Sequence, residues 1–404
     1  MSVAKFKDAT MAEMKRLLAK RGVSVLVRLV TRGPRTLTVD LRLADPDQYD
    51  KAVKIDRPLA LAVGARNVMA YPHLGVVRYE IELPEALWRH YGMGELHTRM
   101  SIGVTSDRKE VGFSLGRPTS LVIGESGSGK SNLVYAMLTQ AMRNYTSDQL
   151  RVGIVDPHGG FTHFSGKAHL AGPPAQDRSE IADVFNWFAG ELAERKSMGE
   201  ARVKSEGLPI LWLVADECSS ADVLGEGRAI NESNMEVMRA VVKEGRKFSM
   251  RSLIITQKPT EADLPGILSI STNRYVGRVS KAVGTGLANA DGAKPHLLTG
   301  KGDFLHVSPT ETKRFQAVMV SEEDYIGLPA GIYPNWPVSS VLDDDLPEVA
   351  VGRPRHEIEP EILAAYMNND GISRNMAREM FGFGQTIHMR YVEFSQRLKR
   401  AMNE

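Results

Sequence analysis

Between residues 120 and 320, short apolar runs alternate with longer stretches whose apolar residues recur at helical spacing. The runs predict strands over residues 121–123, 152–155, 210–215, 253–256, 275–279, 304–307 and 315–320. The stretches between them predict helices over residues 132–144, 179–198 and 232–248. Strands with buried faces that alternate with helices favour an α/β fold, in which a mainly parallel sheet is covered on both faces.

The first hundred residues have a different pattern. Runs rich in β-branched or alternating residues predict strands over residues 24–30, 36–43, 59–63 and 76–83, with breaks at Gly33-Pro34 and Asp45-Pro46. We therefore expect a small α/β module over residues 1–100, joined by a looser stretch over residues 90–108 to a second domain over residues 101–342.

Residues 7–21 predict an amphipathic helix that precedes these strands. Met11, Met14, Leu17 and Leu18 fall on one helical face, basic residues occupy the last turn, and Gly22 is placed as a C-cap. We interpret this helix as a docking element for a partner surface, with a membrane surface as the alternative.

Beyond residue 320 the pattern decays into an acidic and proline-rich stretch, which predicts a linker over residues 343–357. Three helices are then predicted over residues 361–368, 373–381 and 386–399, within a module at 358–404. Their spacing resembles a helix-turn-helix whose last helix includes Arg390 and Arg397. The alternative is a helical docking module, because the charge of this region is nearly balanced.

Composition limits the class of protein. A charged fraction of 25% and a net charge of +2 are ordinary, so any DNA contact must come from local clusters. Cys218 is the only cysteine, which excludes an intrachain disulfide and suits a reducing cytosol. No apolar run approaches the ~18 residues of a membrane span, and the N-terminus has no signal-peptide core. We expect a cytoplasmic protein without a transmembrane segment.

A phosphate-binding loop follows the first predicted strand of the second domain. The pattern G-x-x-x-x-G-K-[ST] is matched by Gly124, Glu125, Ser126, Gly127, Ser128, Gly129, Lys130 and Ser131. Because a helix follows, backbone N–H groups and the helix dipole can bind phosphates. Lys130 is expected to reach the β and γ phosphates of ATP, Ser131 to bind Mg²⁺, and Asn132 to border the nucleotide.

Carboxylates and an amide follow other predicted strands. Asp216 and Glu217 end the apolar run at 210–215, as in the Walker B strand of P-loop ATPases. Asp216 is expected to hold the metal shell, and Glu217 to polarise the attacking water. Gln257 ends the run at 253–256 and is a candidate sensor of the γ-phosphate. Asp156, at the end of the run at 152–155, could support the metal shell or brace the loop.

Six ordered motifs over about 200 residues resemble the FtsK/HerA superfamily of hexameric DNA-pumping ATPases. The motifs are GESGSGKS, IVDPHGG, WLVADE, GRKFSMRSLIITQKP, STNRYVGRVS and GAKPHLLTGKGDFLHV. The N-terminal stretches GPRTLTVDLRL, LALAVGARNV and VVRYEIELP are most similar to FtsK and SpoIIIE. The resemblance implies a RecA-like motor core, a ring of six subunits and double-stranded DNA in its pore. It also implies an arginine finger from the neighbouring subunit, for which Arg246, Arg274 and Arg278 are the candidates. Arg274 and Arg278 are favoured, because they lie in the segment after the predicted sensor strand.

The resemblance therefore predicts an ATP-driven, ring-forming DNA translocase. The membrane-spanning part of FtsK has no counterpart in this sequence, which favours the motor of a plasmid, integrative element or phage. One alternative is a conjugative coupling ATPase that delivers DNA to a secretion channel. Another is a regulator that binds ATP and DNA without translocating, although Glu217 argues against it.

Overall fold

The computed structural model describes residues 2–217, 232–257, 259–261, 263–287, 294–331 and 336. The chain divides into two units, residues 1–340 and 341–404. The predicted linker over residues 343–357 and the helical module over residues 358–404 lie outside the described residues, so both stay predictions.

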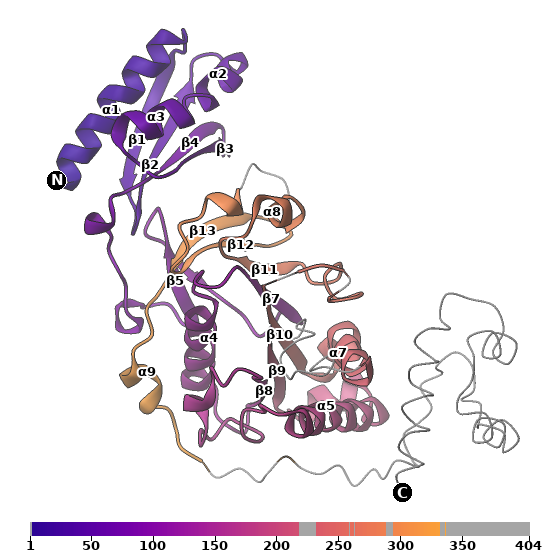
Figure 1. Ribbon diagram of the computed structural model, residues 1–404. Coiled ribbons are helices and arrows are strands. Elements are labelled where there is room, and N and C mark those ends of the chain that lie inside the picture. Colours follow the sequence, from indigo (N-terminus) through magenta and orange to yellow (C-terminus); the bar gives the residue numbers. More distant parts are fainter. Residues whose placement is uncertain are drawn as a thin grey trace, which may run out of the picture. The chain divides into compact units, whose positions relative to one another are not determined.

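The N-terminal module is a four-stranded antiparallel sheet with helices on one face (Figure 1). Its strand order is β1-β2-β4-β3. The strands are β1 (Val25–Arg32), β2 (Thr36–Leu43), β3 (Val68–His73) and β4 (Val76–Glu82). The helices are α1 (Val3–Lys20), η1 (Pro46–Gln48), α2 (Tyr49–Val53) and α3 (Asp56–Val63). Their apolar faces and the sheet form one buried cluster.

Two predictions for this module are wrong. Residues 59–63 form the end of α3 rather than a strand, because Pro58 fits the first helical turn and Gly64 closes the helix in the left-handed region at φ 66°. The strand β3 was missed because it contains Pro72, which an edge strand tolerates.

The proposed docking role of the N-terminal helix is also wrong in its premise. The apolar face of α1 packs into the core of its own module, where Phe6, Met14, Leu17 and Leu18 are buried. That face is therefore not available to a partner protein or a membrane.

The larger domain is built on a nine-stranded sheet of order β6-β5-β13-β12-β11-β7-β10-β9-β8. Its strands are β5 (Ser101–Thr105), β6 (Glu110–Gly112), β7 (Thr119–Ile123), β8 (Leu150–Val155), β9 (Ile210–Asp216), β10 (Met250–Thr256), β11 (Asn273–Val276), β12 (Asp303–Val307) and β13 (Thr312–Ala317). The strands from β11 to β8 are parallel, whereas β12, β13, β5 and β6 pair antiparallel. The expected mainly parallel sheet is thus mixed. The predicted strands near residues 304 and 315 form the antiparallel pair β12–β13, and β5 and β6 extend it, with β5 arising from the stretch predicted to be loose.

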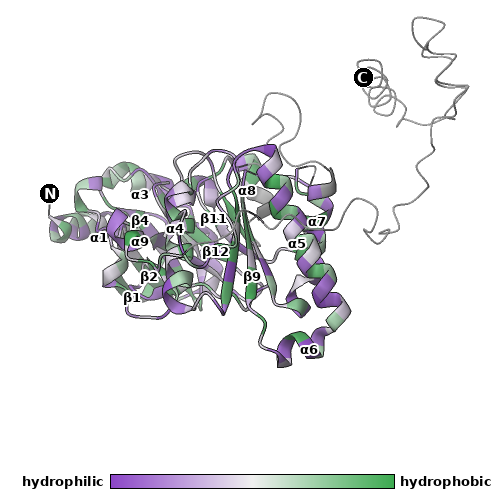
Figure 2. Cartoon of the chain, turned by 90° about the horizontal axis from the view of Figure 1, so that it is seen from below, coloured by the Kyte–Doolittle hydropathy of each residue, from purple (hydrophilic) through white to green (hydrophobic). Residues whose placement is uncertain are grey.

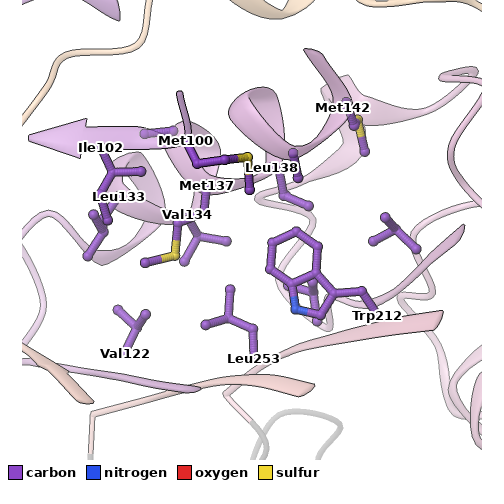
Figure 3. Close-up of a cluster of buried hydrophobic side chains, with 14 of the residues drawn as sticks. Met100, Ile102, Val122, Leu133, Val134, Met137, Leu138, Met142, Trp212 and Leu253 are labelled. Carbon is purple, nitrogen blue, oxygen red and sulfur yellow. The ribbon is translucent and has the colours of Figure 1, made fainter. Parts of the chain in front are cut away.

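Helices cover both faces of this sheet. They are α4 (Lys130–Asn144), α5 (Arg178–Met198), α6 (Glu200–Ser205), α7 (Glu232–Glu244), α8 (Lys281–Leu287) and α9 (Glu322–Ile326). Short 3₁₀ turns are η2 (Glu85–Leu87), η3 (Met93–Glu95), η4 (Thr162–Phe164), η5 (Gly245–Phe248) and η6 (Pro295–Leu297). Side chains of α4 pack on one face against Trp212 and Leu253 (Figure 3). In Figure 2, α5 and α7 have both hydrophobic and hydrophilic residues, as expected for helices with one buried face.

The outer edge of β8 is covered by residues 169–175. The N–H of Val152 donates to His169 O (2.8 Å) and that of Ala171 to Val152 O (3.0 Å). Further along, Ala175 N donates to Ile154 O (2.9 Å) and Asp156 N to Ala175 O (2.8 Å). This edge of the sheet therefore has its backbone groups paired within the chain.

A buried ionic network joins the N-terminal module to the larger domain. Arg314 of β13 donates to both oxygens of Asp303 (2.9 and 2.7 Å) and to Glu80 of β4 (2.8 Å). Burial alone would raise the pKa of Asp303, but the Arg314 guanidinium and the Thr299 N–H outweigh it and lower that pKa. Removing the cation would leave the two buried carboxylates of Asp303 and Glu80 without the guanidinium that they share.

Arg314→Met is expected to lower the free energy of unfolding by about 3–5 kcal/mol for this reason. Urea denaturation followed by circular dichroism measures the change. The matched control is Arg202→Met, which removes an exposed pair with Glu206 and should leave the curve almost unchanged. Similar curves for the two variants would contradict the role assigned to Arg314.

Candidate nucleotide site

The phosphate-binding loop connects β7 to α4, as predicted. Two of its glycines have left-handed backbones, Gly127 at φ 75° and Gly129 at φ 100°. A Cβ at Gly129 would also lie 2.6 Å from the backbone nitrogen of Gly302. Both the backbone conformation and the close approach therefore require glycine at position 129.

Neighbouring segments hold the loop by backbone hydrogen bonds. Gly124 N donates to Thr256 O at the end of β10 (3.2 Å), and Glu125 N donates to Arg278 O after β11 (2.8 Å). From the turn before β12, Lys301 N donates to Gly127 O (3.2 Å) and Gly302 N to Ser128 O (2.7 Å). The loop conformation is thus set by three separate strand ends.

Lys130 lies over the loop that it belongs to. Its Nζ donates to Gly124 O (2.8 Å) and Glu125 O (3.3 Å), and burial lowers its pKa while Glu217 and Asp216 oppose that shift. Ser128 Oγ is buried and has no hydrogen-bond partner within the described part of the chain. Ser126, Gly127 and Ser131 are exposed. Such a set of donors fits a polyphosphate.

The predicted Walker B carboxylates lie at the end of β9. Burial, together with the charges of Glu217 and Asp156, raises the pKa of Asp216 to about 7. Glu217 is 9% exposed and has a left-handed backbone at φ 50°. That conformation is strained for a residue with a side chain, and such strain is concentrated at functional sites.

Gln257 contacts Glu217 directly. The Gln257 side-chain amide donates to Glu217 Oε1, while Glu217 N donates to Ile255 O (3.1 Å). The structure therefore brings together the residues predicted to be the water-polarising carboxylate and the sensor. This contact fixes the direction of the carboxylate.

Both roles left open for Asp156 stay predictions, because its hydrogen bonds lie in the loop that follows β8 rather than in the phosphate-binding loop. Asp156 is fully buried and accepts from Gly160 N (2.9 Å) and Phe161 N (2.6 Å). Tyr135 of α4 donates to Gly160 O (2.6 Å) from the other side. Asp156 braces the loop after β8.

Other predicted site residues make different contacts. Asn132 donates to Val318 O (2.6 Å) and accepts from Val320 N (3.0 Å), so its amide links α4 to the segment after β13. Arg274 donates to Ser271 O and Leu268 O (both 2.8 Å) and is half-buried. The bonds of Arg274 give it a local structural role in place of the predicted arginine finger. The bonds of Asn132 direct its side chain away from the phosphate-binding loop.

The remaining two arginine candidates lie at opposite ends of the parallel strands. The Arg278 side chain is 49% exposed and forms an ion pair with Glu125 of its own phosphate-binding loop (3.5 Å). Arg246 is exposed in η5. Because η5 precedes β10, Arg246 lies at the amino ends of the parallel strands, away from the phosphate-binding loop. Sequence reasoning missed the role of the turn at 300–302, for which Gly300 and Gly302 were the available signal.

Comparisons with known proteins find one family over much of the chain. Residues 87–209 match the model of the FtsK/SpoIIIE family. The DNA translocase FtsK of Streptomyces coelicolor is 22% identical over 357 residues, which cover 78% of this chain and 38% of that protein. FtsK of Mycobacterium tuberculosis is 23% identical over 346 residues, covering 76% and 41%. The chain thus spans about two fifths of the length of these relatives.

A solved structure supports the fold. The monomer form of the pCW3 conjugation coupling protein TcpA with ATPγS has a TM-score of 0.52 and 15% identity, covering 78% of this chain and 97% of that one. The fold, with its phosphate-binding loop, is that of P-loop ATPases with a RecA-like core, as predicted. Residues 87–209 match the model of an FtsK/SpoIIIE domain, and the similarity to the FtsK relatives extends over most of the chain.

Among the described residues, no helix combines the length and the apolar character needed to cross a membrane.

Asp216→Asn is expected to stabilise the protein in EDTA without nucleotide. Because the folded-state pKa of Asp216 lies near 7, above the ordinary 3.8, the folded protein keeps a proton that the unfolded chain releases. Stability is therefore lost as pH rises towards 7. The gain in the free energy of unfolding should be on the order of 4 kcal/mol above pH 7 and smaller at pH 5. Thermal unfolding at pH 5 and pH 8 measures it, and equal gains at both would contradict the raised pKa.

Proposed function

We propose that this chain is an ATP-hydrolysing motor that moves along double-stranded DNA. The observation that supports it most is the contact between Glu217 and Gln257 beside the phosphate-binding loop. A carboxylate held in a fixed direction next to a nucleotide site suits hydrolysis better than binding alone. DNA as the substrate follows from the relatives, which are named DNA translocases.

Each residue has a stated role in the proposed reaction. Lys130 exchanges its bonds to the loop carbonyls for bonds to the β and γ phosphates. Bound Mg²⁺ would offset the charge of the phosphate oxygens, held by Ser131 and, through water, by Asp216. Glu217 polarises the attacking water, and Gln257 holds Glu217 and monitors the γ-phosphate.

The proposed working form is a ring in which ATP is hydrolysed at each subunit interface. The exposure of Ser126, Gly127 and Ser131 leaves room for a neighbouring subunit to complete the site. Of the arginine candidates, Arg246 is exposed and remote from its own loop, which suits action on the neighbouring subunit's nucleotide. Arg278, beside its own Glu125, suits action within the subunit. The proposed location is the cytoplasm.

A conjugative coupling ATPase is the second candidate. The match between this chain and TcpA extends over 97% of the TcpA chain, whereas the matches to the FtsK relatives extend over about two fifths of those proteins. A motor that works alone should displace a third strand from duplex DNA with only ATP and Mg²⁺ present. A coupling ATPase that depends on its channel, or a non-translocating regulator, should not.

Glu217→Gln is expected to retain ATP binding and to hydrolyse ATP about 10²- to 10⁴-fold more slowly, because the amide keeps the shape but not the charge that polarises water. Phosphate release with and without long duplex DNA measures the rate, and titration with a fluorescent ATP analogue measures binding. Lys130→Ala is the contrasting variant and should lose binding first. A wild-type rate for Glu217→Gln would remove Glu217 from the mechanism.

Mixing experiments test the two arginines. Arg246→Ala and Glu217→Gln subunits, each inactive alone, should regain partial ATPase activity when mixed, since some interfaces then pair an intact Arg246 with an intact Glu217. Arg278→Ala should show no such rescue, because Arg278 and Glu217 belong to the same subunit's site. Rescue by Arg278→Ala and none by Arg246→Ala would reverse the assignment.

A further inference from the structure

The turn that supports the phosphate-binding loop has an unusual backbone. Gly300, Lys301 and Gly302 have φ values of 73°, 51° and 92°, so three consecutive residues lie in the left-handed region. For Lys301 this conformation is costly, and it persists only where the surroundings impose it. The N–H groups of Lys301 and Gly302 bind the loop carbonyls of Gly127 and Ser128. The shape of the turn therefore sets the shape of the loop.

The N-terminal module holds the carbonyl side of the same turn. Arg35 Nη1 donates to Gly300 O (3.1 Å) and Nη2 to Lys301 O (2.7 Å). Gln316 adds a bond from its Nε2 to Lys301 O (3.1 Å). A single guanidinium thus binds two successive carbonyls of a strained turn, and its planar donors suit that geometry.

The position of Arg35 is itself fixed. Its guanidinium lies 4.3 Å from the centre of the Trp88 ring, and the residue is 5% exposed. Gly33, in the same β1–β2 hairpin, approaches the backbone of Ser106 so closely that a Cβ would lie 2.7 Å from its Cα. The hairpin is therefore pressed against the larger domain with Arg35 directed at the turn.

The geometry points to Arg35 as a positioning residue for the nucleotide site. It acts through the turn at 300–302 on the carbonyls of the phosphate-binding loop, so the docking of the N-terminal module tunes nucleotide affinity. Arg35 touches none of the residues assigned to nucleotide or catalysis. The inference rests on the proposed binding of ATP at that loop.

The test compares nucleotide affinity in the full chain without DNA. Arg35→Met replaces the guanidinium by an apolar side chain of similar length and so removes both donors. The variant should bind a fluorescent ATP analogue about tenfold more weakly, which corresponds to ~1.4 kcal/mol. Arg35→Lys, with one cation in place of the planar pair of donors, should give an intermediate loss and serves if Arg35→Met does not fold. In steady-state kinetics the KM for ATP should rise more than kcat falls.

Asn67→Ala is the matched control. Asn67 is also a side chain of the N-terminal module that donates to a backbone carbonyl of the larger domain, Leu297 O (3.2 Å), but it does not contact the turn. It should lower the melting temperature without changing nucleotide affinity. Wild-type affinity in folded Arg35→Met or Arg35→Lys, or an equal loss in Asn67→Ala, would overturn the inference. Failure of the wild-type chain to bind nucleotide would instead overturn the proposed function.

Discussion

The structure depends on how the phosphate-binding loop is held. A loop that directs its N–H groups at a phosphate cannot satisfy its backbone through a helix or a sheet ladder, so neighbouring segments must supply the remaining partners. Here the partners are Thr256, Arg278 and the turn at 300–302. Thr256 and Arg278 lie at the carboxyl ends of β10 and β11, the two parallel strands that flank β7, so all three strands end on the same side of the sheet. The third partner requires the antiparallel addition of β12, which explains why a mixed sheet surrounds this site.

Acidic side chains gather at these same carboxyl ends of the strands. Burial, together with the charges of Glu217 and Asp156, raises the pKa of Asp216, and Glu217 has a strained backbone. None of this favours the folded state of the protein without ligand. It is the arrangement expected where stability is given up for a site that a bound cation and phosphates would complete. The brace formed by Asp156 and the contact from Gln257 keep the geometry fixed despite that cost.

Local patterns predicted much of this arrangement. The loop motif, the strand ends at Asp216 and Gln257, and the helix α4 follow from spacing, because parallel strands bring their ends together whatever the details of packing. What failed depended on contacts that the pattern of side chains does not reveal. The face of α1 looked free because its partner sheet lies later in the chain, and Arg274 looked available because its acceptors, Ser271 and Leu268, are backbone carbonyls. Carbonyl acceptors leave no signal in side-chain identity.

The covered edge of β8 has a consequence for assembly. An open edge strand is a template on which another chain can add its own strand. With residues 169–175 already paired along β8, that edge cannot extend into a neighbouring subunit. Contacts between subunits at this edge would be made by side chains rather than by a shared sheet. In the proposed ring, such contacts would let neighbouring subunits shift against one another without breaking a backbone ladder.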